Sequence, residues 1–359
     1  MAAARLYLDH AATTPVLPEA RSAMADALGS WANPSSPHGD GRAARALLEQ
    51  ARARIAETLD WRHDAILTSG ASEAIAIAAA RARVPGRSLG PTEHEAVVAA
   101  MGPDARQFAV GSDGVIDPAG LDQDLAKGPA LVAIQHVNNE TGVIQPLDQI
   151  AEAVHGARSL LLADCAQGAG KLPLPDADFI AVSAHKLGGP PGMGALLVRD
   201  MATLAPSGGQ EKGYRRGTEN VPAAAGLSAA LQARAFSDAM PRLAELRAKL
   251  EQALVAAGAS VIGAESERIA TIGAYAMPGV SSASQLVQLD LAGIAVSAGS
   301  ACSSGSMKPS RVLAAMGVSL EIAQTVIRVS FGPHTSAAQI DRFVTEWRNL
   351  AERARTRAA

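Results

Sequence analysis

Residues 178–198, DFIAVSAHKLGGPPGMGALLV, contain the pattern that predicts the fold. An apolar run, FIAV, leads into Ser183, His185 and Lys186, and a turn rich in glycine and proline leads into a second apolar run, ALLV. Short, continuous apolar runs bounded by turn residues are typical of strands buried on both faces of a sheet. Most of the six lysines of the chain lie among polar or turn residues, whereas Lys186 stands where a buried strand ends.

Two interpretations of Lys186 are open at this point. In the first, its amine extends from the strand end to water, and burial habits alone favour this about two to one for an arbitrary strand-end lysine. In the second, a partly desolvated pocket makes the amine nucleophilic and suited to Schiff-base chemistry. The rest of the chain has to decide between them.

Length and composition indicate a soluble protein with a large domain and a smaller one. The chain has 359 residues, of which 48% are hydrophobic and 19% charged. A net charge of −3 and few aromatic residues give no basis for binding nucleic acid or an anionic membrane. The N-terminus is unlike a signal peptide, and apolar runs are too short to span a membrane. Two distant cysteines form no disulfide framework, so we expect a cytoplasmic protein.

Predicted strands alternate with predicted helices over the first two thirds of the chain. Apolar strands are expected within 65–69, 130–142, 159–170 and 179–198, and helices at 18–28, 42–59, 92–101 and 146–157, with His94 in the first turn of the third helix. This order predicts a mainly parallel, doubly wound sheet covered on both faces. A glycine-rich loop at 206–220 and further helices then lead into an α+β domain. We expect a large domain at 14–235 and a small domain formed by 1–13 and 236–359.

Four polar clusters fall at the carboxyl ends of predicted strands, where ligands of such sheets bind. They are Gly70–Ser72, Asn138–Asn139, Asp164–Gln167 and Ser183–Lys186. The strand–glycine–helix arrangement at Gly70 is suited to binding an anion, although taken alone it is equally typical of a capped helix with nothing bound. The phosphate-loop and dinucleotide motifs do not occur there. Four clusters at strand ends predict one site.

These residue types together suit pyridoxal phosphate. Buried Asp164 needs a cationic partner, and a protonated pyridine nitrogen is one. Lys186 can form the Schiff base, and His94 can stack on the ring and transfer protons near neutral pH. Ser72, Ser183 and His185, with the helix start at Gly70 and Ala71, can hold a phosphate, and Gln167 can hydrogen-bond the ring hydroxyl. No metal site is predicted.

The two cysteines have different surroundings. Cys165 lies in a strand-end pattern and is predicted to pack as a small hydrophobe. Cys302 lies in SAGSACSSGSMKPS, where small and polar residues predict a mobile, exposed loop. An exposed thiol on such a loop indicates a reactive cysteine, and the alternative of a tolerated surface cysteine receives about one chance in four.

The motifs resemble those of the cysteine desulfurases of the NifS/IscS type, within the class V aminotransferase-like pyridoxal-phosphate enzymes. The motifs that carry this resemblance run in order through nearly the whole chain: YLDHAATTP, NPSSPH, TSGASE, TEHEAV, HVNNETG, DCAQGAGK, SAHK, RRGTEN, GSACSSGSMKPSRVL and IRVSFG. The most specific feature is SAHK following DCAQ, with GSAC in a loop of serines and glycines. The resemblance implies fold type I, with a large domain built on the parallel sheet and a smaller α+β domain.

The resemblance also implies a role for each predicted site residue. Lys186 forms the internal aldimine and His94 acts as acid and base. Asp164 pairs with the ring nitrogen and Gln167 with the phenolic oxygen, while Ser72, Ser183 and His185 bind the phosphate. Thr218 of a second subunit completes the phosphate site, which implies a homodimer. Asn139 and Arg328 receive the substrate carboxylate, and Arg328 as a purely structural ion pair is the less favoured alternative.

The implied reaction converts L-cysteine to L-alanine and leaves a persulfide on Cys302, from which sulfur passes to an acceptor such as an iron–sulfur scaffold protein. Two alternatives are open. The chain can be a selenocysteine lyase or another pyridoxal-phosphate enzyme of the same fold, against which Cys302 argues. It can also be a non-catalytic sulfur-carrier subunit, against which Lys186, Asp164 and His94 argue.

Overall fold

The structure is a computed structural model that describes residues 5–29, 31–299 and 310–358. Its largest element is a seven-stranded sheet in the order β2-β8-β7-β6-β5-β3-β4. The strands are β2 (Asp64–Thr68), β3 (Gly86–Leu89), β4 (Arg106–Gln107), β5 (Ala130–Gln135), β6 (Leu160–Asp164), β7 (Phe179–Ser183) and β8 (Gly194–Val198). Strands β7, β6, β5, β3 and β4 are parallel, and only β8 runs antiparallel to its neighbours β2 and β7. The predicted mainly parallel sheet is therefore confirmed.

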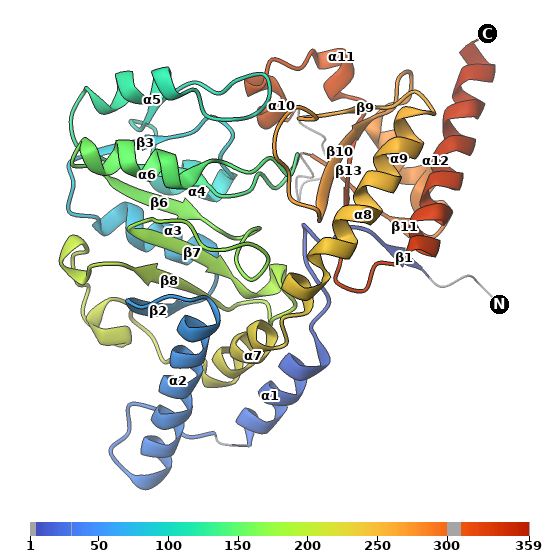
Figure 1. Cartoon of the computed structure of the whole chain (residues 1–359). Coiled ribbons are helices and arrows are strands. Elements are labelled where there is room, and N and C mark those ends of the chain that lie inside the picture. Colours follow the sequence, from blue (N-terminus) through green and yellow to red (C-terminus); the bar gives the residue numbers. More distant parts are fainter. Residues whose placement is uncertain (1–4, 30, 300–309, 359) are drawn as a thin grey trace.

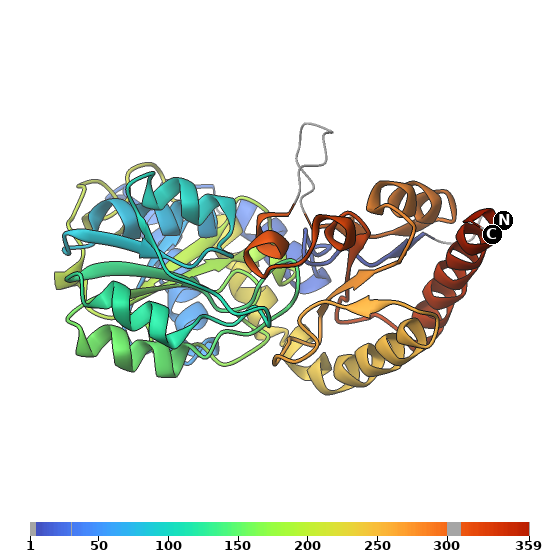
Figure 2. The ribbon, with the colours of Figure 1, turned by 90° about the horizontal axis from the view of Figure 1, so that it is seen from above.

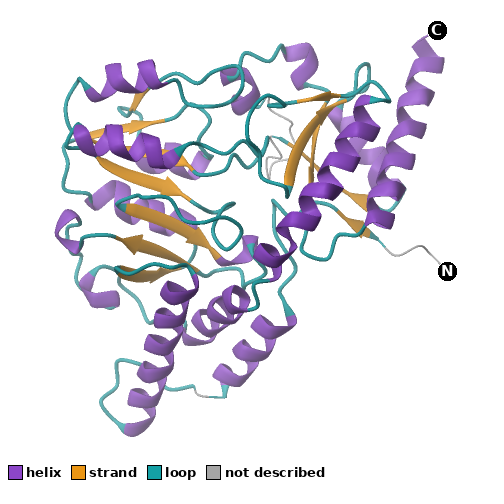
Figure 3. Cartoon of the chain, in the orientation of Figure 1, coloured by secondary structure: helices purple, strands orange, loops and turns teal. Residues whose placement is uncertain are grey.

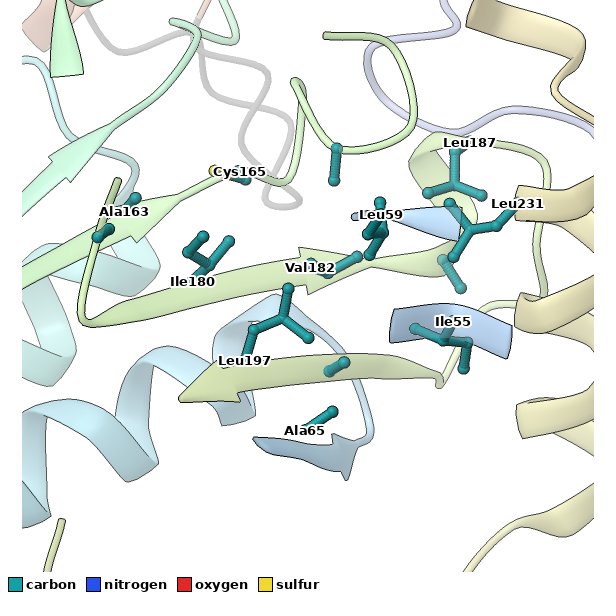
Figure 4. Packing of buried hydrophobic residues seen from close by; sticks show 14 of the residues in the cluster. Ile55, Leu59, Ala65, Ala163, Cys165, Ile180, Val182, Leu187, Leu197 and Leu231 are labelled. Carbon is teal, nitrogen blue, oxygen red and sulfur yellow. The ribbon is translucent and has the colours of Figure 1, made fainter. Parts of the chain in front are cut away.

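Both faces of this sheet are covered by helices, as Figure 3 shows. The helices are α2 (Gly39–Thr58), α3 (Ala71–Arg81), α4 (Glu95–Met101), α5 (Pro118–Leu125), α6 (Leu147–Gly156) and α7 (Val221–Gln232), and α1 (Pro18–Leu28) packs on α7. Alternate residues of a strand serve opposite faces. Ile180 and Val182 of β7 pack toward α2, α6 and α7, as Figure 4 shows in part, whereas Phe179 and Ala181 pack toward α3 and α4. This explains why the strands read as continuous apolar runs.

Two predicted helix starts differ from the observed ones. Helix α2 begins at Gly39 rather than 42, because the His38 side chain accepts a hydrogen bond from the N–H of Gly41 and caps the helix. Helix α4 begins at Glu95, so His94 is its N-cap rather than a residue of its first turn. Both differences have the same origin. His38 and His94 cap the two helices, and histidine is not among the usual N-cap residues, so the sequence did not mark these starts.

A second, smaller layer lies beside the carboxyl ends of the parallel strands (Figures 1 and 2). It contains a four-stranded sheet of β12 (Ser297–Ala298), β13 (Val326–Ser330), β10 (Ile272–Ala276) and β9 (Ser260–Val261), and a parallel pair of β1 (Leu6–Tyr7) and β11 (Ile294–Ala295). Its helices are α8 (Ala235–Val255), α9 (Ser282–Leu291), α10 (Arg311–Ala315), α11 (Leu320–Ala323) and α12 (Ala337–Ala358).

Helices α8 and α12 build a separate core on this smaller sheet. Helix α12 presents an apolar stripe at helical spacing, including Ile340, Phe343 and Trp347, which packs with Leu243 and Leu250 of α8. Short helix α10 contributes to a small cluster on residues of β10 and β13 that face the other way. The domain boundary expected at 235 and 236 falls between α7 and α8 and stays a prediction. Among the described residues, none of the helices is long and apolar enough to span a membrane.

Candidate active site

A pocket of about 880 Å³ opens where the carboxyl ends of the parallel strands meet the smaller sheet. Its walls come from the region of the seven-stranded sheet, from the smaller sheet and from the N-terminal segment at Asp9, Ala11 and Ala12. Many of the residues predicted from the sequence line it: Gly70, Ala71, Ser72, His94, Asn139, Asp164, Gln167, Ser183, His185, Lys186 and Arg328. The structure thus brings together the four polar clusters at strand ends, as the sheet topology requires.

Lys186 ends a short 3₁₀ turn, Ala184–Lys186, that follows β7 directly. Its Nζ donates hydrogen bonds to the main-chain carbonyls of Ala11 at 2.6 Å and Ala12 at 2.8 Å. Burial, aided by the positive charge of Arg328, lowers the pKa of Lys186 to about 8. The amine therefore lies in the wall of the pocket with a large neutral fraction near pH 8, the state that attacks a carbonyl carbon. This favours the nucleophilic interpretation over a lysine that extends to water.

Asp164 and His94 face the same pocket as Lys186. Asp164 ends β6 and is buried, and its Oδ1 accepts a hydrogen bond from the N–H of Ala166 at 3.0 Å. Burial raises the pKa of Asp164, while the nearby charges of His94 and Lys186 oppose this effect. The Nδ1 of His94 accepts a hydrogen bond from the N–H of Ala96 at 3.1 Å. A neutral ring held in this way carries its proton on Nε2, so Nε2 donates a hydrogen bond and Nδ1 is the only atom that can take up a further proton.

The turn between β2 and α3 has the properties of an anion site. Gly70 has φ of +152°, a conformation that a residue with a side chain rarely adopts. Within the described chain, no side chain caps α3 at this position, so the first N–H groups of the helix are available to an anion. His185 approaches from the other side, with its Nδ1 3.2 Å from the hydroxyl of Thr13. Burial and the charges of Lys186 and Lys171 lower the pKa of His185 to about 4, so it is neutral at pH 7.

The donor set fits pyridoxal phosphate. Gln167 donates through Nε2 to the carbonyl of Ala11 at 2.8 Å, while its buried Oε1 has no hydrogen-bond partner among the described residues. An unpaired buried amide oxygen is costly unless a ligand meets it. A ring hydroxyl at Gln167, a ring cation at Asp164, a phosphate at the start of α3 and an aldehyde at Lys186 would each satisfy one of these groups. The described residues hold no cluster of His, Cys, Asp or Glu that suits a metal ion.

Arg328 lies on β13 and is almost fully buried at the far wall of the pocket. Its guanidinium donates to Asp9 Oδ1 at 2.8 Å and to the carbonyl of Asn139 at 2.9 Å. The ion pair that was the alternative interpretation of Arg328 is therefore present. Its Nε is buried and has no partner within the described chain. Arg328 thus combines a structural ion pair with a free donor in the pocket wall.

Six acidic or basic residues of the pocket were not predicted as site residues from the sequence: Asp9, Glu73, Glu93, Glu95, Glu140 and Arg311. Glu93 accepts a hydrogen bond from the N–H of Gln135 at 2.9 Å, and burial raises its pKa well above the usual range. The signal was present, because each of these residues lies in a motif that carries the family resemblance: YLDHAATTP, TSGASE, TEHEAV, HVNNETG and GSACSSGSMKPSRVL. The sequence does not show that these segments, which are far apart in the chain, meet in one pocket.

One predicted site residue lies away from the pocket, one is outside the described residues, and Cys165 behaves as expected. Thr218 is exposed and does not line the pocket of its own chain. Cys302 lies outside the described residues, so its predicted loop and role stay predictions. Cys165 is buried in the core (Figure 4), and burial raises the pKa of its thiol well above the usual range. The packing interpretation of Cys165 is confirmed.

Comparisons with known proteins agree over nearly the whole chain. The family model described as aminotransferase class-V matches residues 6–343. A protein named cysteine desulfurase from Cereibacter sphaeroides is 37% identical over 95% of this chain and 94% of its own length. One named cysteine desulfurase IscS from Dictyoglomus turgidum is 33% identical over 98% and 95%. The solved structure of a NifS-like protein from Rickettsia africae superposes with a TM-score of 0.89 at 28% identity, covering 97% of this chain and 99% of that one.

Proposed function

This chain belongs to the class-V aminotransferase family, and we propose that it is a cysteine desulfurase, which converts L-cysteine to L-alanine and leaves a persulfide on Cys302. The observation that carries the proposal is the meeting of Lys186, Asp164, His94 and Arg328 in one pocket whose lining also includes Gly299 and Arg311. Gly299 directly precedes segment 300–309, which contains Cys302, and Arg311 follows that segment after Ser310. Because Cys302 follows Gly299 by three residues, the connecting chain reaches about 11 Å at most.

The family uses pyridoxal phosphate, and the fit described above indicates which residues would hold it. Lys186 would carry it through its amine, Asp164 would face the ring nitrogen, and Gln167 the ring hydroxyl. The phosphate would lie at Gly70, Ala71 and Ser72, with Ser183 and His185 beside it and Thr218 supplied by a second subunit of a homodimer. When bound, this cofactor withdraws electrons from the α-carbon of an amino acid.

The other residues of the pocket bind and orient the substrate. The Arg328 fork and Asn139 would receive the carboxylate of L-cysteine, because a planar guanidinium matches the two oxygens of that group. Lys186, once its amine is released, is the group placed to move protons, and Nε2 of His94 is placed to donate a hydrogen bond. While Nδ1 accepts the hydrogen bond from Ala96, the neutral ring of His94 can only donate a hydrogen bond from Nε2, and it can take up a proton at Nδ1 once that bond is released.

Sulfur transfer then needs a nucleophile that is not one of the residues proposed to hold the cofactor. The thiolate of Cys302 attacks the sulfur of the substrate, an S–S bond forms, and the bond between Cβ and sulfur breaks. Its electron pair stays with the amino-acid skeleton, which takes up a proton and leaves as L-alanine. The products are one alanine and one persulfide for each cysteine, and no external oxidant is required.

The persulfide is the form in which sulfur leaves the enzyme. We propose a sulfur acceptor, such as an iron–sulfur scaffold protein, as the partner, and a reducing cytoplasm as the location, because a free reactive thiol persists there. The relatives reported above carry the name cysteine desulfurase, so the alternative of a selenocysteine lyase is not favoured.

The test is a single turnover with L-cysteine and cofactor-loaded protein. Mass spectrometry should find one added sulfur on Cys302, and amino-acid analysis should find an equal amount of alanine. Cys302→Ser should retain the visible absorbance of lysine-bound cofactor and lose sulfide release, whereas Cys165→Ser should retain both. Full desulfurase activity in Cys302→Ser would show that Cys302 is not the acceptor.

A further inference from the structure

The turn at residues 138–142 connects the two parts of the pocket. The side-chain oxygen of Asn138 accepts hydrogen bonds from the N–H groups of Glu140 and Thr141, both at 2.9 Å, and from the Thr141 hydroxyl at 3.1 Å. Asn138 and Thr141 are buried. This set of bonds fixes the backbone of the turn. At the tip of the turn, the main-chain carbonyl of Asn139 accepts a hydrogen bond from Arg328. The side chain of the next residue, Glu140, bonds instead to Ser310.

The carboxyl group of Glu140 contacts both described residues that flank segment 300–309. The hydroxyl of Ser310 donates to Glu140 Oε2 at 2.6 Å, and the same hydroxyl accepts from the N–H of Leu313 and caps α10. On the other flank, a Cβ built on Gly299 would lie 2.2 Å from the same Oε2. Only a glycine allows so close an approach. One carboxyl oxygen therefore lies against Gly299 and Ser310 together.

The carboxyl group of Glu140 is buried, and burial of its charged form costs free energy. Glu140 is 9% exposed, and burial raises its pKa to about 7, although the Ser310 bond, Arg328 and Arg311 oppose the effect. An alanine at this position would avoid that cost. The contacts that offset it all lead to the ends of segment 300–309 or to the expected substrate-binding arginine. The structure thus connects the substrate side of the pocket to the segment that carries Cys302.

We propose that Glu140 is a positioning residue for sulfur transfer, which holds Gly299 and Ser310 against the turn that presents Asn139 to the substrate. This inference rests on the proposed function, because it assumes that Cys302 accepts the sulfur. Among the described residues, Glu140 makes no hydrogen bond to a predicted cofactor residue. Its main effect therefore falls on the second half of the reaction, in which Cys302 takes part, and its effect on the first half is small.

The experiment separates these halves in cofactor-loaded protein. The spectral change on mixing with L-cysteine reports the first half, and the rate of persulfide formation on Cys302, followed by quenching and mass spectrometry, reports the second. Ser310→Ala and Glu140→Ala should each slow persulfide formation about tenfold, with a spectral response within about twofold of wild type. Because both remove one shared interaction, the double variant should be no slower than the slower single variant.

Two variants serve as controls. Ser319 caps the neighbouring short helix α11 through the N–H of Ile322, as Ser310 caps α10, but among the described residues its hydroxyl makes no hydrogen bond to Glu140. Ser319→Ala should therefore keep both rates. Ser310→Thr keeps the hydroxyl and should restore most of the persulfide rate, which a general loss of stability would not allow.

Three results would overturn the inference alone: equal persulfide rates in Ser310→Ala and Ser319→Ala, losses that multiply in the double variant, or a spectral response that falls in parallel with persulfide formation. A wild-type protein that forms alanine but no persulfide on Cys302 would instead overturn the proposed function, and the inference with it.

Discussion

Lys186 and Asp164 stand at the ends of β7 and β6, on one side of the pocket, where parallel strands and an apolar core position them. Arg328 and Glu140, on the other side, are held by polar bonds to partners such as Asp9 and Ser310. We call these the strand side and the polar side. Close packing in the core tolerates little movement of the strand ends. On the polar side, a single substitution can remove one hydrogen bond and leave the others in place. Substitutions on the strand side should therefore affect cofactor binding, and those on the polar side should affect substrate and sulfur steps.

The largest effect is expected for Lys186→Ala. Removing the amine should abolish the visible absorbance of bound cofactor and lower alanine formation by roughly a thousandfold or more, because the group that carries the cofactor is lost. Absorbance and amino-acid analysis check this. Lys127→Ala, at an exposed lysine paired with Asp124, is the matched control and should behave as wild type. A coloured, active Lys186→Ala would contradict the assignment of the strand side.

A smaller effect is expected for Arg328→Lys on the polar side. Lysine keeps the charge and loses the fork, so kcat/KM for L-cysteine should fall about a hundredfold with cofactor absorbance retained. Steady-state kinetics measure this. Asp9→Asn removes the ionic partner of Arg328 but keeps the guanidinium. Comparing it with Arg328→Lys therefore shows whether a loss of activity comes from substrate binding or from the loss of a structural ion pair. If both variants lost kcat/KM and thermal stability equally, the role of Arg328 would be structural.

The pKa of Lys186 predicts a pH dependence on the strand side. Since burial lowers that pKa to about 8 from the ordinary 10.5, the neutral amine accumulates at lower pH than in a free lysine. The rate at which apo-protein takes up pyridoxal phosphate should rise about tenfold from pH 6 to pH 7 and level off above pH 8. Stopped-flow absorbance measures it. A rate that kept rising to pH 10 would indicate an unperturbed lysine.

The smallest effect is expected for Glu140→Gln and concerns stability. The folded state raises the pKa of Glu140 to about 7, so between the ordinary value and 7 it binds the proton that the unfolded chain has lost. Wild type should therefore lose stability relative to the variant as pH rises from 5 to 8. We expect a change of about 3 °C in the difference between their melting temperatures. Calorimetry of apo-protein at both values tests it, and an unchanged difference would show that Glu140 titrates normally.

The strand side could be predicted from the sequence to a large extent. Apolar runs such as FIAV before Lys186 and SLLLA before Asp164 already identify buried strands, and the rule for parallel sheets brings their carboxyl ends to one edge. His94 was placed in the right segment, although its role as the cap of α4 was missed. These predictions depend on local patterns, for which neighbouring residues carry the information.

The polar side could not be predicted in this way. Glu140 and Ser310 are 170 residues apart, and Asp9 and Arg328 are 319 apart. Each lies in a motif that was recognised, yet nothing local indicates that Glu140 meets the ends of segment 300–309. Such contacts depend on how the smaller sheet packs against the larger one, which is set by the whole of both cores.

The sequence by itself thus determined the sheet and the strand ends, and it predicted Lys186 as the centre of a cofactor site, because strand periodicity and the apolar character of each run are local properties. The tertiary structure alone decided that Lys186 is bonded to the carbonyls of Ala11 and Ala12, that Arg328 pairs with Asp9, and that Glu140 lies against Gly299 and Ser310. The physical reason is that burial and charge act through space, and only packing brings distant segments within the few ångströms over which they are felt.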